Sequence, residues 1–168
     1  SISWVAIDEP NPTDVDANRV FRQGFDRGGA TFSRLEGAWY GHGRIYFVST
    51  NGGDVEEGQV WECDPANDRL RLLFESPDAE VLNMPDNICV SPRGGLVLCE
   101  DGSDTQFVHG LTVDGQVFRF AQNNVVLNGE RNDLVGDFTE SEFAGATYSP
   151  DGRWMFVNIQ QPGITFAV

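Results

Sequence analysis

Short runs of alternating apolar and polar residues fill most of the chain and are separated by turn signals. The run at 143–148 is followed by the turn sequence Ser149-Pro-Asp-Gly152 and then by a second apolar run. Pro, Asp and Gly favour tight turns, so this stretch predicts a β-hairpin. Matching turns at Gly43-Arg44 and Gly94-Gly95 also lead into apolar strands. We therefore expect a chain of repeated antiparallel strands.

The hairpins recur about every 50–60 residues, and each unit has room for four short strands. This recurrence is typical of β-propeller blades. A β-sandwich or a set of unrelated hairpins is the alternative. The predicted fold class is all-β, with about two complete blades and a started third. We expect one partial propeller domain, divided into a strand with a connector at 1–35, blades at 36–84 and 85–130, and an incomplete blade at 140–168.

Finer features of the pattern predict individual elements. Gly58-Gln-Val-Trp61 and Gly115-Gln-Val-Phe118 match each other and are predicted to be the third strands of their blades. Before the first blade, alternation over Ile2–Ile7 predicts a strand. A short helix is expected around Asp16–Gln23, ending near Gly24. Because propellers have roughly 4–8 blades, other blades are expected from a longer protein or another chain.

Charge excludes several classes of partner. The net charge is −15 and the pI is about 4.2, so the protein repels nucleic acid and anionic membranes and attracts cations. All 11 basic residues are Arg, which leaves only guanidinium groups to hold an anion. No apolar run approaches the roughly 20 residues of a membrane span. The first residues also lack the basic and apolar regions of a signal peptide.

Cysteine and histidine give weak signals. Cys63, Cys89 and Cys99 have no metal-binding spacing and are interpreted as small buried hydrophobic residues. The spacing of Cys89 and Cys99 permits a disulfide but does not predict one. His42 and His109 lack partner spacing and are interpreted as surface or packed side chains.

Carboxylates stand near the start of the predicted first strand of each unit: Glu36, Asp86 and Glu142. The first strand of a blade is normally the innermost, so these groups are expected to converge at one end of the central channel. Convergent carboxylates either bind cations or have raised pKa values, because like charges so close disfavour joint ionisation. A metal site is the simpler outcome.

The ends of the second strands add further oxygen groups, including Glu100 and Asp101. Oxygen ligands suit Ca²⁺, Mg²⁺ or Fe³⁺ better than Zn²⁺. Asp101, beside Gly102, is more typical of a turn former. Arg34 lies two residues before Glu36 and is expected on the same face of an extended strand. It could hold a phosphate in two hydrogen bonds or form an ion pair with Glu36 or its neighbours.

Several motifs together resemble the PhoX family of bacterial alkaline phosphatases, over nearly the whole chain. The motifs are Arg34-Leu-Glu-Gly37, Pro85-Asp-Asn87, Gly94-Gly-Leu-Val-Leu-Cys-Glu-Asp-Gly102, Ser149-Pro-Asp-Gly152 and Phe156-Val-Asn-Ile-Gln160 with Pro162-Gly163. The resemblance implies a six-bladed propeller, export to the periplasm or cell exterior, and hydrolysis of phosphate esters at a centre of Fe³⁺ and Ca²⁺.

Carried over by motif, Glu36 corresponds to a metal-ligating glutamate, and Asp86 and Glu142 correspond to residues near the centre. The family's cysteine ligand to iron lies in an upstream segment that this chain lacks, and Cys99 lies on a later strand. The resemblance thus implies a C-terminal portion with an incomplete metal site, which by itself would have weak or no phosphatase activity. The alternatives are a calcium-dependent lactonase of the gluconolactonase type and a non-catalytic propeller scaffold, and fold alone does not decide among them.

Overall fold

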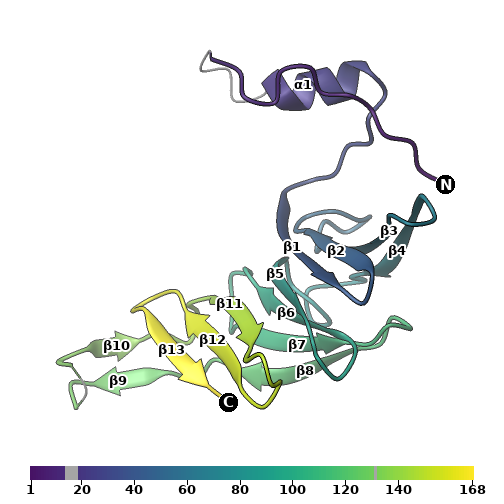
Figure 1. Ribbon diagram of the computed structural model, residues 1–168. Helices are drawn as coiled ribbons and strands as arrows, with labels where there is room; N and C mark the ends of the chain where they lie inside the picture. The colour runs from purple at the N-terminus through teal and green to yellow at the C-terminus, as the bar shows by residue number, and fades with distance from the viewer. Residues whose placement is uncertain (14–18, 131) are drawn as a thin grey trace.

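The computed structural model describes residues 1–13, 19–130 and 132–168, and it is almost entirely β-structure (Figure 1). Two four-stranded antiparallel sheets, which we name the first and second blades, follow one another along the chain. The first blade contains β1 (Leu35–Gly41), β2 (Arg44–Ser49), β3 (Gln59–Asp64) and β4 (Arg69–Glu75). The second blade contains β5 (Pro85–Val90), β6 (Leu96–Glu100), β7 (Phe107–Leu111) and β8 (Val117–Gln122).

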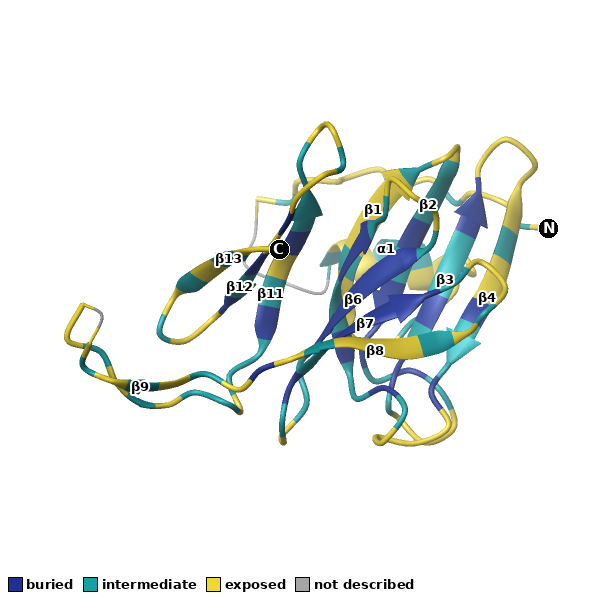
Figure 2. Ribbon diagram, turned by 90° about the horizontal axis from the view of Figure 1, so that it is seen from below, coloured by how far each residue is buried: buried dark blue, intermediate teal, exposed yellow. Residues whose placement is uncertain are grey.

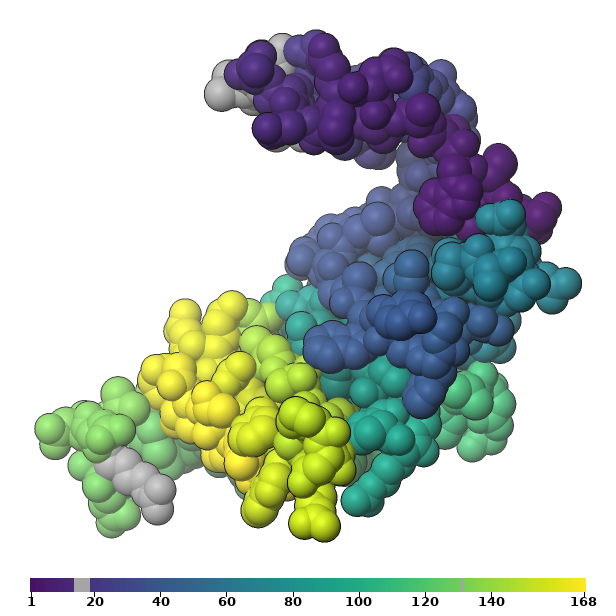
Figure 3. All heavy atoms as spheres, viewed as in Figure 1, coloured from purple at the N-terminus to yellow at the C-terminus, as the bar shows by residue number. Residues whose placement is uncertain are grey.

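The rest of the chain forms a third sheet, a small hairpin and an N-terminal arm. The third blade has three strands, β11 (Phe143–Tyr148), β12 (Met155–Ile159) and β13 (Ile164–Ala167). The hairpin of β9 (Val126–Asn128) and β10 (Val135–Asp137) connects the second and third blades. In the space-filling view the arm, which carries α1 (Arg19–Asp26), stands away from the third blade (Figure 3).

In every blade the strands pair in chain order, and the first strands of neighbouring blades contact each other. β5 therefore lies between β1 and β11, which makes these three the inner strands of a partial β-propeller. Apolar side chains fill the space between the sheets in two clusters. One lies between the first and second blades and includes Val48, Val60 and Leu98, and the other lies between the second and third blades and includes Cys99 and Val157. All five residues of β6 are buried because both faces of its sheet are covered (Figure 2).

The same backbone hydrogen bond occurs at one end of each of the three blades, where the first strand begins and the second strand ends. We call this the inner end of the blade. In each blade the N–H group just after the second strand donates to the carbonyl just before the first strand. The pairs are Thr50 to Arg34 (2.9 Å), Asp101 to Met84 (2.9 Å) and Gln160 to Glu142 (3.0 Å). Each first strand then has a register shift near its beginning. Glu36 and Asp86 are thus equivalent positions, whereas Glu142 lies two positions earlier in its blade.

Three predicted elements differ from the structure. Residues Ile2–Ile7 form no strand, and the backbone N–H of Ile2 instead bonds to the carbonyl of Asp68 at 2.7 Å. With no neighbouring strand, the alternating pattern of this segment has nothing to pair with. The helix α1 continues past Gly24 to Asp26. The beginning of the predicted helix falls on residues 14–18, outside the described part of the chain.

The third strand of the second blade was also predicted wrongly. It is β7, whereas Gly115-Gln-Val-Phe118 leads into β8, the fourth strand. His109 and Gly110 in β7 weaken the strand pattern in the sequence. Gly110 lies opposite Phe118, and a Cβ atom there would come within 2.1 Å of the Phe118 ring. The glycine therefore makes room for an aromatic ring, and this packing is not visible in the alternation.

All three cysteines are free and buried. Cys99 pairs across the sheet with Asn87, and Cys89 pairs with Val97, so the two cysteines do not face each other. Burial raises the pKa of Cys89 to about 12 and also raises that of Cys99, which keeps both as neutral thiols. Among the described residues, no helix has both the length and the apolar character needed to cross a membrane.

Candidate metal centre

Three carboxylates from separate segments meet at the inner ends of the second and third blades. Asp86 is the second residue of β5, Asp101 follows β6, and Glu142 precedes β11. One oxygen from each lies within 4.8 Å of the others. β5, β6 and β11 pack together, which brings positions up to 56 residues apart in the sequence into one cluster. We call Asp86, Asp101 and Glu142 the carboxylate cluster.

The carboxylate cluster holds more negative charge than its partly buried setting favours. Burial, with the charges of Asp101 and Glu36, raises the pKa of Asp86 to about 6. Burial, followed by the influence of Asp101 and then Asp86, raises the pKa of Glu142 to about 7. A cation would remove this repulsion and favour the ionised forms.

Two oxygens of the carboxylate cluster are oriented to accept a ligand. Oδ1 of Asp86 and Oε2 of Glu142 are buried and have no hydrogen-bond partner among the described residues. A buried anionic oxygen without a partner is costly, and a bound cation is one way to satisfy it. A donor set made only of carboxylates suits hard cations such as Ca²⁺ or Fe³⁺. The residues present therefore fit the cation class that the sequence suggested.

Arg34 lies at the rim of this cluster. Its guanidinium NH2 is 3.1 Å from Oδ2 of Asp101 and 3.7 Å from Oε1 of Glu36. Arg34 precedes β1 and has a left-handed backbone with φ of 46°, so strand alternation does not bring it beside Glu36. Glu36 is exposed and lies outside the three-oxygen group, although its charge reaches Asp86. The sequence allowed two roles for Arg34, an ion pair or phosphate binding, and the structure contains the ion pair.

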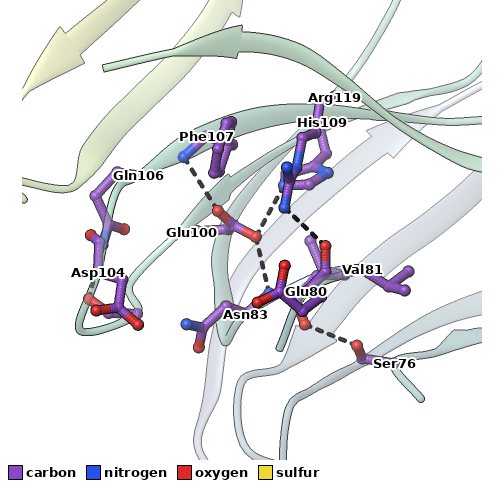
Figure 4. A network of polar contacts seen from close by, with 12 residues as sticks. Ser76, Glu80, Val81, Asn83, Glu100, Asp104, Gln106, Phe107, His109 and Arg119 are labelled. Carbon is purple, nitrogen blue, oxygen red and sulfur yellow. Dashed lines mark hydrogen bonds and ion pairs between the residues drawn. The ribbon is translucent and has the colours of Figure 1, made fainter. Parts of the chain in front are cut away.

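Glu100 is turned away from the carboxylate cluster although it is adjacent to Asp101 in sequence. Its Oε1 accepts a hydrogen bond from the N–H of Asn83 at 2.8 Å, and its Oε2 accepts one from Phe107 at 3.0 Å. Nε2 of His109 lies 2.8 Å from Oε1 (Figure 4). The structure therefore brings together three of the five predicted metal ligands, places Glu36 nearby and directs Glu100 elsewhere.

Gln160 was expected from the sequence as a polar group at the end of a second strand, but Asp137 and Glu140, two other walls of this site, were not identified. A cavity of about 350 Å³ opens beside the carboxylate cluster, and its lining adds Asp137, Glu140 and Gln160 to Asp101 and Glu142. Asp137 and Glu140 come from β10 and the loop that follows it, between two blades. Their chain position has no equivalent in the first repeat, so the repeat pattern could not place them. The cluster of acidic residues at 137–142 was the available signal.

Comparison with known proteins identifies the family. The family model of alkaline phosphatase PhoX matches residues 1–163, and the chain belongs to this family. No curated protein matches the chain significantly in sequence.

A solved structure of a gluconolactonase, XC5397 from Xanthomonas campestris, is similar with a TM-score of 0.54 at 17% identity. The similarity covers 82% of this chain and 38% of that chain, so the present chain spans well under half of that structure's length. At this identity the likeness supports the propeller fold and nothing further.

Proposed function

We propose that this chain supplies part of the metal centre of a phosphomonoesterase of the PhoX type. The observation that carries the proposal is the convergence of Asp86, Asp101 and Glu142, from three separate segments, in a member of this family. Bound Ca²⁺ and Fe³⁺ would neutralise phosphate charge and activate the attacking oxygen. The remaining parts of the centre would come from blades outside this chain, so we expect weak or no activity from the chain alone.

In this proposal the carboxylate cluster binds the cation and Arg34 binds the phosphate group. Asp86 and Glu142 each present a buried, unpartnered oxygen, and Asp101 connects the cation to Arg34 through the 3.1 Å ion pair. With a cation held at Asp101, the guanidinium of Arg34 would be available to bind a phosphate oxygen. Arg34 is the residue for which we propose a catalytic role, because its planar donors match a phosphate group.

The substrate is proposed to be a small phosphate ester outside the cytoplasm. The acidic surface disfavours nucleic acid as a substrate. We propose export to the periplasm or beyond because that is the usual location in the family.

The test is metal analysis and p-nitrophenyl phosphate turnover with the full-length protein. We expect bound calcium and iron, and activity that is lost with a chelator and restored by metal. A metal-loaded protein without phosphomonoesterase activity would remove the phosphatase assignment while keeping the metal centre.

A calcium-dependent lactonase is the second candidate, and the fold likeness to a gluconolactonase is compatible with it. Hydrolysis of sugar lactones by protein containing calcium and no iron would select it. A propeller with neither activity nor tight metal binding would be a scaffold.

A further inference from the structure

Glu100 is a buried carboxylate, 3% exposed, whose role is not explained by the metal centre. We propose that it is a positioning residue, which holds Asp86 and Asp101 at the separation that a cation requires. This inference rests on the proposed metal centre. It is argued from the hydrogen bonds of Glu100 and from the equivalent position in the first blade.

The first step is that Glu100 joins three segments of the second blade. It ends β6, accepts a hydrogen bond from the N–H of Asn83 before β5, and accepts another from the N–H of Phe107 at the start of β7. Figure 4 shows the two carboxylate oxygens directed toward these separate segments, with His109 beside Oε1. The 2.8 Å contact with His109 has the distance of an ion pair but not the angle of a hydrogen bond. Both oxygens are thus engaged within the blade and unavailable to a cation at the cluster.

The second step links these bonds to the carboxylate cluster. Asn83 is followed by Met84, which has a left-handed backbone with φ of 49° and accepts a hydrogen bond from the N–H of Asp101. This conformation is unfavourable for a non-glycine residue, so it needs surrounding bonds to hold it. Asp86 lies two residues beyond Met84. Glu100 therefore fixes the segment that leads into Asp86, and its own backbone leads into Asp101.

The third step is that the first blade contains one of these two bonds, made by a smaller side chain. Ser49 ends β2, and its Oγ accepts a hydrogen bond from the N–H of Ser33 at 3.1 Å. Ser33 precedes Arg34, which has φ of 46° and accepts a bond from Thr50. A residue at the end of the second strand thus stabilises the left-handed residue in both blades. Of these two residues, Glu100 also bonds to the third strand of its blade, through the N–H of Phe107. Glu100 is followed by Asp101, a member of the carboxylate cluster, whereas Ser49 is followed by Thr50.

The test compares calcium binding by two full-length variants that each replace a buried carboxylate with an amide. Glu100→Gln leaves one backbone N–H facing an NH2 group and breaks one of the two bonds. Asp64→Asn is the matched control: Asp64 is also buried, and it accepts bonds from the N–H of Ala66 and from Asn67. Asp64 lies at the opposite end of its blade from the cluster, since its neighbour Cys63 pairs with Ile45 at the start of β2.

After chelation, both variants and the wild type are titrated with CaCl₂ in a calorimeter. We expect Glu100→Gln to weaken calcium binding by about 10-fold, the lower end of the range for residues that orient metal ligands. The calcium affinity of Asp64→Asn should stay within about twofold of the wild type, even if its melting temperature falls as much as that of Glu100→Gln. Because only affinity is affected, raising calcium about tenfold should restore phosphatase turnover in Glu100→Gln.

Two further measurements separate the outcomes. In metal-free protein, hydrogen exchange should accelerate in peptides covering Asn83 and Asp101 for Glu100→Gln and remain unchanged there for Asp64→Asn. If Glu100→Gln does not fold, Glu100→Asp, which keeps the charge but is one methylene too short to reach both the Asn83 and Phe107 N–H groups, should weaken calcium binding by a similar factor. Unchanged calcium affinity in Glu100→Gln, or in Glu100→Asp where it replaces that variant, overturns this inference alone. A wild type that binds no calcium overturns the proposed metal centre together with it.

Discussion

The first and second blades share one backbone arrangement at their inner ends but carry different chemistry. At equivalent positions the first blade has Arg34, Ser49 and Thr50, and the second has Met84, Glu100 and Asp101. The left-handed residue before the first strand occurs in both blades, at Arg34 and Met84. At these three positions the first blade therefore presents the Arg34 guanidinium at this end, whereas the second presents the Asp101 carboxylate. The repeated backbone provides fixed positions, and single substitutions between repeats determine what each position can bind.

A second contrast lies further out in the same two blades. Glu62 and Arg71 form an ion pair of 2.9 Å across β3 and β4. The equivalent positions across β7 and β8 hold Gly110 and Phe118, whose ring fills the place of a side chain. The same cross-strand position is thus polar in one blade and packed in the other.

The largest effect is expected when Asp101 of the second blade is replaced by threonine, the residue type at the equivalent position of the first blade. Asp101→Thr should weaken calcium binding and phosphatase activity of the full-length protein by at least about 100-fold, because it removes one of three ligands. Calorimetry with CaCl₂ and turnover of p-nitrophenyl phosphate measure the change. The control is Thr50→Ser, which keeps the hydroxyl in the first blade and should bind calcium normally. Calcium binding within about threefold of the wild type in Asp101→Thr would remove this residue from the site.

The reverse exchange replaces Arg34 of the first blade with methionine, the residue type at the equivalent position of the second blade. Arg34→Met should lower kcat/KM for a phosphate ester by about 10–100-fold, since loss of one charged donor to the reacting group costs this much or more. Calcium affinity should stay the same or rise, because a positive charge 3.1 Å from Asp101 is removed. Kinetics and calorimetry on one preparation measure both quantities. A parallel fall in calcium affinity would assign Arg34 to holding the cluster instead of the substrate.

A third variant tests the contrast between the third and fourth strands of the two blades, where Gly110 packs against Phe118. Gly110→Ala should destabilise the protein by about 1 kcal/mol or less, because the half-exposed Phe118 ring has to move away from the new methyl group and loses its contact with the sheet. Denaturant unfolding measures the loss. Gly24→Ala in α1 is the control, where the added Cβ meets only Ile7 at 3.6 Å and should be neutral or slightly stabilising. Equal effects of the two variants would contradict the packing role of Gly110.

The smallest effect concerns pH and the metal-free protein. The pKa values of Asp86 and Glu142, about 6 and about 7, lie above the ordinary values of 3.8 for Asp and 4.5 for Glu. The folded state therefore binds more protons than the unfolded state between those values, and its stability falls as pH rises from about 4 to about 7. Melting with a chelator present should show this decline, at about 2–4 °C for each kcal/mol lost. Added calcium should remove it, and a decline that calcium leaves unchanged would assign the effect to other groups.

The sequence predicted the class of fold well because its signals are local. Turns such as Ser149–Gly152 and the alternation of apolar residues identify hairpins from neighbouring residues alone, and the family comparison agrees with them. The family and the partial propeller predicted from the sequence are confirmed. The strand at Ile2–Ile7 failed because a strand also needs a partner. β7 was missed because Gly110 is explained only by a ring on the next strand.

For the candidate site, the sequence determined which oxygen-bearing residues stand at strand ends, including Asp86, Asp101 and Glu142. Tertiary structure decided which of them meet. Alternation specifies the direction of a side chain inside a regular strand, but it no longer applies at a strand end or a register shift. Glu100 and Asp101, adjacent in sequence at such an end, therefore point to different places: one into the blade and one into the cluster. Only the packing of β11 against β5 and β6, together with the bonds of Glu100 inside its own blade, could assign them these separate roles.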